Sequence, residues 1–186
     1  CGLDKGVFSL IQGKNYAIAS QIVTHPQVKA VGFTGSERVG MILQAQINQR
    51  PEPIPFYGEL GSVNPQFILP GKLAQDGAGI AQSLVTSLMM GLGQFCTSPG
   101  IWAVIEDENY PGFAATAAEA ISQQPAGVML TPGIAASYQS AVAKWQSIDG
   151  VELLASGQQG KTHECAAALF GADLNTFVAN PALHEE

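Results

Sequence analysis

The segment VKAVGFTGSERVG (residues 28–40) contains the clearest secondary-structure pattern in the chain. Its first half is a largely apolar run with valines at positions 28 and 31 and a phenylalanine at position 33, which predicts a strand over residues 28–33. Small residues then end the strand, and Ser36 is a suitable N-cap for a helix over residues 37–49. Apolar side chains at helical spacing support that helix. A strand that leads directly into a helix is typical of α/β proteins with a parallel sheet.

The same alternation extends in both directions from this segment. A helix is expected over residues 16–24, and the alternating apolar residues 6–12 predict a strand before it. Beyond the proline-rich break at residues 51–55, strands and helices continue to alternate. We expect strands over residues 56–61, 65–69, 101–106, 151–155 and 166–179, and helices over residues 74–91, 113–123 and 135–147. Both halves of the chain are therefore predicted to be α/β.

Composition argues against several classes of protein. Of the 186 residues, 12% are charged and 46% are hydrophobic, and the formal net charge is −7. So few basic residues argue against nucleic acid or an anionic membrane as a partner. No signal peptide is visible, and glycine and proline interrupt the longest weakly charged segment (residues 77–105), which argues against a membrane span. Three cysteines without metal-ligand spacing predict no metal site and favour reduced thiols in a cytoplasmic protein.

The segment GQFCTSPG (residues 93–100) places Cys96 between a helical run and a turn of small residues. A thiol in such a turn is accessible to a substrate and can be a nucleophile if a base activates it. The alternative is a buried hydrophobic role, which is usual for a free cysteine. The histidine nearest in sequence is the distant His163, so a Cys–His hydrolase has no local support. Cys165, in contrast, is expected to fill the interior of a strand.

Two further stretches each allow two interpretations. At Gly35 and Ser36 a strand end meets a helix N-terminus, where free N–H groups and the helix dipole favour a phosphate. The simpler interpretation is a capped helix. Glu59, in the segment GELGS, is a carboxylate among apolar and glycine residues and can act as a general base. Considered alone, it is more simply an exposed glutamate at a strand end.

Taken in order, FTGSERVG (33–40), GELGSVNP (58–65) and GQFCTSPG (93–100) resemble the successive signatures of the aldehyde dehydrogenase superfamily. They are most similar to its 2-oxoglutarate semialdehyde (2,5-dioxopentanoate) dehydrogenases and NADP-dependent fatty aldehyde dehydrogenases. The resemblance covers the whole chain. It implies the end of a Rossmann-like cofactor domain over residues 1–61 and most of an α/β catalytic domain over residues 62–186. It also implies that the chain is an internal part of a longer, homo-oligomeric enzyme, and that the 186 residues alone are inactive.

The resemblance also implies roles for individual residues. Cys96 would be the nucleophile that attacks an aldehyde to form a thiohemiacetal. After hydride transfer to NAD or NADP, Glu59 would activate the water that hydrolyses the resulting thioester. The backbone N–H of Cys96 would donate to the oxyanion. The residues implied to bind the cofactor are Gly13, Gly35, Ser36, Val39, Leu60 and Glu186.

The chain departs from the usual family pattern in two places. Residues 61–64 are Gly-Ser-Val-Asn, whereas the family motif has two glycines and then a lysine after the glutamate and leucine. At the Gly13 turn the second family glycine is replaced, with Ala17 or Ile18 near its place.

Two other functions remain compatible with these residues. The first is a thiol acyltransferase or hydrolase that uses Cys96 with a distant histidine. The second is a folded α/β fragment without catalytic activity. Aldehyde-dependent reduction of NAD or NADP would distinguish the dehydrogenase from both.

Overall fold

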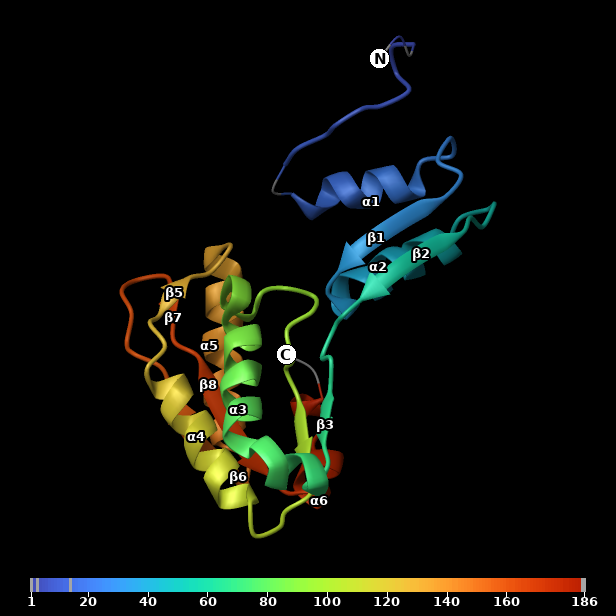
Figure 1. Cartoon of the computed structure of the whole chain (residues 1–186). Helices are drawn as coiled ribbons and strands as arrows, with labels where there is room; N and C mark the ends of the chain where they lie inside the picture. Colours follow the sequence, from blue (N-terminus) through green and yellow to red (C-terminus); the bar gives the residue numbers. More distant parts are fainter. Residues whose placement is uncertain (1, 3, 14, 185–186) are drawn as a thin grey trace. The chain divides into compact units, whose positions relative to one another are not determined.

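The computed structural model describes residues 2, 4–13 and 15–184 (Figure 1). The chain divides into two compact units, Cys1–Gly61 and Ser62–Glu186. Assigning the first to cofactor binding and the second to thiol chemistry stays a prediction. None of the helices that the described residues form is long and apolar enough to cross a membrane.

The first unit contains, within its described residues, α1 (Tyr16–Thr24), β1 (Val31–Gly35), α2 (Glu37–Asn48) and β2 (Phe56–Leu60). The two strands are parallel, with Gly35 opposite Leu60. Helix α2 connects them and packs against both, and α1 packs against α2 (Figure 1). The buried hydrophobic cluster of the described residues in this unit consists of Val23, Leu43 and Ile47. The strand–helix pattern predicted for residues 28–49 is confirmed, although the strand begins and ends a few residues later than expected.

Both helices of the first unit begin at side chains that cap them. The Asn15 side chain accepts a hydrogen bond from the Ala17 N–H (2.8 Å) at the start of α1. The Ser36 hydroxyl accepts one from the Val39 N–H (3.4 Å) at the start of α2, as predicted. These bonds satisfy N–H groups that have no partner within the helix.

Arg50 joins the end of α1 to the chain that follows α2, a role that the sequence did not suggest. Its buried guanidinium donates to the carbonyls of Val23 (2.7 Å), His25 (3.0 Å) and Val28 (2.9 Å). A buried charge is tolerated only when it is hydrogen-bonded, and a cation near the C-terminus of a helix also complements the helix dipole. Arg50 therefore fixes the position of α1 in this unit.

The strand predicted over residues 6–12 is wrong. These residues form a turn and irregular chain, and their apolar side chains are exposed, with Phe8 at 82%. An alternating pattern becomes a strand only when a neighbouring strand accepts and donates its backbone hydrogen bonds. The described residues of this unit offer no such neighbour to residues 6–12.

The second unit is larger. Its described elements are β3 (Gln66–Ile68), α3 (Pro70–Met89), η1 (Met90–Gly93), β4 (Trp102–Val104), α4 (Tyr110–Ser122), β5 (Gly127–Val128), α5 (Pro132–Gln146), β6 (Val151–Ser156), β7 (Glu164–Cys165), β8 (Ala168–Ala172), α6 (Leu174–Ala179) and η2 (Pro181–Leu183). Strands β3 and β4 are parallel, whereas β5–β7 and β6–β8 are antiparallel. The last two pairs thus differ from the parallel arrangement that is typical of α/β proteins. No crossover helix lies between β6 and β8, and a parallel pair would require one.

The last predicted strand, residues 166–179, is only half correct. Strand β8 ends at Ala172, and Asp173 then starts the short helix α6 by accepting a hydrogen bond from the Thr176 N–H (2.7 Å). That hydrogen bond lowers the pKa of the Asp173 carboxyl. Aspartate is a preferred N-cap, so the sequence does indicate a helix start at Asp173. The apolar residues on both sides of Asp173 favoured a continuous strand instead.

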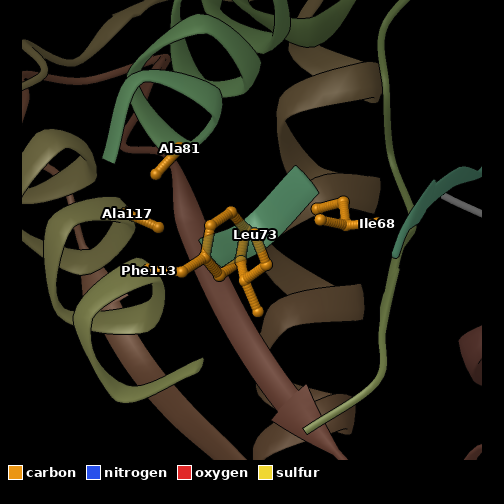
Figure 2. Close-up of a cluster of buried hydrophobic side chains, with 5 residues drawn as sticks. All are labelled: Ile68, Leu73, Ala81, Phe113 and Ala117. Atoms are coloured by element: carbon orange, nitrogen blue, oxygen red, sulfur yellow. The ribbon is translucent and has the colours of Figure 1, made fainter. Parts of the chain in front are cut away.

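The main core of the second unit lies where α3 and α4 meet β3 and β4. Figure 2 shows the five buried side chains that form it, Ile68, Leu73, Ala81, Phe113 and Ala117. The two alanines allow the helices to approach closely, and Trp102 packs edge-on against Phe113 with ring centroids 6.3 Å apart. Burying a side chain as large as Phe113 stabilises a fold by roughly 1.5–3 kcal/mol. This core holds β3 and β4 together, and with them the segments that precede each strand.

Candidate active site

Cys96 lies on an exposed turn that follows α3 and η1. Gly93, with φ 73°, lets the chain leave η1 in a left-handed conformation that favours glycine. A hydrogen bond from the Ser98 N–H to the Phe95 carbonyl (3.0 Å) closes the turn around Cys96. The alternative of a buried hydrophobic cysteine is therefore wrong for Cys96 within this chain.

The pairing of β3 with β4 brings residues 62–64 against the Cys96 turn. The Gly100 N–H donates to the Val63 carbonyl (3.0 Å), just before the ladder begins. The Asn64 side-chain amide donates to the Cys96 carbonyl (2.6 Å), and the Ser62 hydroxyl donates to the same oxygen. The backbone of the turn is thus held from one side while the thiol-bearing residue stays exposed. Sequence reasoning gave Ser62 and Asn64 no role; the only signal was their departure from the family motif.

In the first unit, the carboxyl ends of β1 and β2 bring together several residues predicted to act on the cofactor or the substrate. Gly35 and Leu60 are opposite each other, and the Gly61 N–H donates to the Gly35 carbonyl (3.2 Å). Glu59 is exposed and lies opposite Thr34. Ligands of open parallel sheets bind at this end of the strands. The catalytic role of Glu59 stays a prediction.

Gly35 and Ser36, which are predicted to hold the phosphate groups of the cofactor, lie at the start of α2. Gly35 and Ser36 are exposed at the N-terminus of this twelve-residue helix, where free N–H groups and the helix dipole favour an anion. The half-buried Val39 packs against the core of the unit. Leu60 lies close to Gly40, because a Cβ atom added to Gly40 would be only 2.2 Å from the Cδ2 atom of Leu60. Both side chains therefore contribute to packing, and their contact with the cofactor stays a prediction.

Two further residues, Gly13 and Glu186, are predicted to bind the cofactor. Gly13 lies in the exposed segment before α1, where an added Cβ atom would be 2.4 Å from the Cδ1 atom of Ile18. Glu186 lies outside the described residues. The structure thus provides no contact that supports either assignment.

In the described part of the second unit, no histidine is hydrogen-bonded to Cys96. Within residues 62–184, no hydrogen bond joins Cys96 to His163 or His184; His184 contacts the Phe177 carbonyl instead (2.8 Å). Across the described ranges, no group of three or more histidine, cysteine, aspartate or glutamate residues could hold a metal ion. No observation in the second unit therefore favours a Cys–His hydrolase.

Comparisons with known proteins identify the family to which this chain belongs. The model of the aldehyde dehydrogenase family matches residues 1–171. The chain belongs to the aldehyde dehydrogenase family. The resemblance identified from the three sequence segments is thereby confirmed.

Two curated members of the aldehyde dehydrogenase family match the whole chain. It is 43% identical over 187 aligned residues to alpha-ketoglutaric semialdehyde dehydrogenase 2 of Azospirillum brasilense. It is 35% identical over the same length to alpha-ketoglutaric semialdehyde dehydrogenase of Acinetobacter baylyi. In both cases the match covers 100% of this chain and 35% of the relative, so the chain spans about a third of the length of these enzymes.

Solved structures support the aldehyde dehydrogenase fold. A NAD-dependent benzaldehyde dehydrogenase from Corynebacterium glutamicum superimposes with a TM-score of 0.74 at 21% identity, covering 96% of this chain and 40% of that one. Proline utilization A from Bradyrhizobium japonicum gives a TM-score of 0.77 at 20% identity, covering 91% of this chain and 18% of that one. The predicted fold class is confirmed.

The two described cysteines of this aldehyde dehydrogenase chain should differ in reactivity. Cys165 is buried in β7, and burial raises the pKa of its thiol, so less thiolate is present at a given pH. Cys96 is exposed. We expect iodoacetamide at neutral pH to label Cys96 at least roughly tenfold faster than Cys165, because alkylation requires an accessible thiolate. Peptide mapping by mass spectrometry would measure both rates, and in urea the difference should disappear. Equal rates in the folded protein would contradict this expectation.

Proposed function

We propose that these residues belong to a longer enzyme that oxidises an aldehyde to a carboxylic acid with NAD or NADP. Cys96 is its nucleophile and Glu59 its general base. The observation that carries this proposal is the exposed Cys96 turn, present in a chain that is 43% identical over its whole length to a semialdehyde dehydrogenase.

Cys96 contributes the covalent step. Its thiolate attacks the aldehyde carbonyl carbon, a C–S bond forms, and the oxygen becomes the oxyanion of a thiohemiacetal. The turn supports this step because it is exposed and its backbone is held by hydrogen bonds. A backbone N–H directed at the developing oxyanion would stabilise the transition state without needing to reorganise, and the Cys96 N–H is our candidate donor.

Gly35 and Ser36 contribute to holding the cofactor, which accepts hydride when bound. The N-terminus of α2 offers N–H groups to the pyrophosphate, and the Ser36 cap keeps that helix end ordered. Ordering matters because hydride transfer requires the reacting atoms to be held at a near-attack distance.

Glu59 contributes the second half of the reaction. The carboxylate takes a proton from water, and the resulting hydroxide attacks the thioester carbon; the C–S bond breaks and the Cys96 thiolate leaves. The exposure of Glu59 at the end of β2 supports this role, since a general base must be reachable by water.

The names of the two curated relatives favour 2-oxoglutarate semialdehyde as the substrate. The test is to follow reduction of NAD and of NADP by the purified full-length enzyme with this semialdehyde and with pentanal. Pentanal matches its carbon chain but lacks both the carboxylate and the keto group. We expect the semialdehyde to be oxidised with the higher kcat/KM. Equal values would contradict the substrate assignment, and no reduction with any aldehyde would contradict the proposed reaction.

Ser36 provides a direct test of the cofactor site. Ser36→Asp keeps a good N-cap for α2 but adds a negative charge where the pyrophosphate would bind, whereas Ser36→Asn keeps the cap without the charge. We expect Ser36→Asp to raise the Kd for NAD(P) by roughly tenfold or more and Ser36→Asn by about threefold at most, because the introduced carboxylate repels the negatively charged pyrophosphate whereas the asparagine amide is neutral. Gly35→Val is a less specific variant, because its Cβ atom would lie 2.7 Å from the Phe33 ring.

The affinities can be measured by titration calorimetry, with thermal unfolding as the check that α2 remains intact. Equal affinities of the two Ser36 variants would remove the start of α2 from the cofactor site.

A further inference from the structure

Two side chains from the segment before β3 hold the peptide that joins Cys96 to Thr97. The Asn64 Nδ2 group donates to the Cys96 carbonyl (2.6 Å), and the Ser62 hydroxyl donates to the same oxygen. Asn64 Nδ2 also lies 3.1 Å from the Ser98 carbonyl and 2.9 Å from the Ser62 hydroxyl. Two donors on one carbonyl fix the peptide plane on the C-terminal side of Cys96.

The opposite side of Cys96 is fixed as well. The Ser98 N–H donates to the carbonyl of Phe95 (3.0 Å), and that carbonyl belongs to the peptide whose N–H is the backbone N–H of Cys96. Both peptide planes that flank the nucleophile are therefore held. One is held by the turn itself, and the other by Ser62 and Asn64.

The segment that carries Ser62 and Asn64 has a backbone suited to this contact. Asn64 has a φ of 39°, in the left-handed region, where asparagine is tolerated better than most residues. The Val63 carbonyl accepts from the Gly100 N–H (3.0 Å), which keeps the segment beside the turn. Ser62 and Asn64 are both half-buried, and the hydrogen bonds from Asn64 to Ser62 and to the Ser98 carbonyl are partly buried, so water competes less for these two bonds than for the exposed ones to the Cys96 carbonyl.

We propose that Ser62 and Asn64 are positioning residues for Cys96. By fixing the Cys96–Thr97 peptide, they hold the Cys96 Sγ atom and backbone N–H in the geometry that attack on a carbonyl carbon requires. The inference rests on the proposed function in that Cys96 is the nucleophile. This role gives a reason for the difference from the family motif at residues 61–64, because the glycine that the motif has in place of Ser62 would supply no hydroxyl donor.

If this proposal is correct, loss of these hydrogen bonds should slow acyl transfer to Cys96 more than it slows alkylation of Cys96. Once the Cys96–Thr97 peptide is freed, the backbone torsions of Cys96 can change and redirect its N–H and side chain relative to a bound carbonyl group, and a misplacement of about 1 Å can cost on the order of a hundredfold in rate. Alkylation by iodoacetamide forms an S–C bond as iodide leaves and develops no oxyanion. It therefore needs the thiolate but not the donor geometry.

The experiment compares these two reactions of Cys96 in the full-length enzyme. The acylation probe is p-nitrophenyl acetate. The thiolate attacks its carbonyl carbon, a C–S bond forms, and the C–O bond breaks as p-nitrophenolate leaves with the electron pair. The proton of the thiol passes to the solvent. The burst of p-nitrophenolate gives the acylation rate constant, and mass spectrometry of the Cys96 peptide gives the alkylation rate constant.

We expect Asn64→Ala to lower the acylation rate constant by roughly tenfold or more while the alkylation rate constant changes by less than about threefold. Ser62→Gly should lower acylation by a smaller factor, and Ser62→Thr, which keeps the hydroxyl, should restore it. The matched control is Asn180→Ala. It removes a part-buried asparagine hydrogen bond to the Thr176 carbonyl (2.8 Å) and should leave both constants within about twofold of the parent.

A purely structural role would lower both constants together with the melting temperature, so the ratio of the two constants isolates positioning. If Asn64→Ala does not fold, Ser62→Gly decides the proposal. It is overturned if the decisive variant keeps an acylation rate constant within about twofold of the parent. The proposed function fails separately: an enzyme that shows no aldehyde-dependent reduction of NAD(P) contradicts the dehydrogenase, whatever the ester burst shows.

Discussion

The Cys96→Ala variant of the full-length enzyme is expected to oxidise aldehydes at least about 10⁴-fold more slowly than the parent, as when a covalent nucleophile is removed from other enzymes. Without the thiol, no thiohemiacetal or thioester can form, and alanine offers no alternative nucleophile. Binding of NAD(P) should remain, because Gly35 and Ser36, to which we assign the phosphates of the cofactor, lie in the first unit and not beside Cys96 in the chain.

The matched control for this variant is Cys165→Ala. Cys165 is buried in β7, and its thiol lies 3.9 Å from the Ala135 carbonyl. Its removal should lower the melting temperature and leave turnover of the folded enzyme within about threefold, since losing one buried sulfur atom creates only a small cavity. Steady-state kinetics and titration with cofactor measure both effects. A Cys96→Ala enzyme with turnover close to that of the parent would show that another group is the nucleophile.

Local signals predicted the strand–helix segments well. The sequence 28–49 contains a largely apolar run, an N-cap serine and helical spacing, and all three favour the same structure that β1 and α2 adopt. The start of α3 was placed too late because Asp76 interrupts that helix with φ −158° and then accepts a hydrogen bond from the Gly79 N–H (3.1 Å). The prediction therefore described only the longer second part of this element.

Non-local features were the ones that the sequence could not supply. Residues 6–12 have a strand pattern but find no partner strand in the described part of their unit, and sheet formation depends on that partner. The hydrogen bonds from Ser62 and Asn64 to the Cys96 turn join residues more than thirty positions apart in the chain. Only the pairing of β3 with β4 reveals them, whereas Cys96 and Glu59 could be proposed from local motifs that resemble a known family.

The Glu59→Gln variant should separate the two halves of the reaction. Glutamine has nearly the same shape but cannot accept the proton of the attacking water, so we expect deacylation to slow by roughly 10²–10⁴-fold. Attack by Cys96 and hydride transfer precede that step and should be slowed much less. Mixing the enzyme with aldehyde and NAD(P) should then give a rapid burst of reduced cofactor, close to one per active site, followed by a slow steady state.

The fold should tolerate this substitution. Glu59 is exposed near the end of β2, and its neighbour Leu60 is the residue that lies close to α2. The control is Glu52→Gln, which removes an exposed carboxylate from the same unit and breaks only a surface ion pair with Lys29 (3.1 Å). Such pairs contribute little to stability, so both phases should match those of the parent. If Glu59→Gln lowered the burst rate as much as the steady-state rate, the base would be needed before the thioester forms. Its assignment to hydrolysis would then be wrong, even with Cys96 retained as the nucleophile.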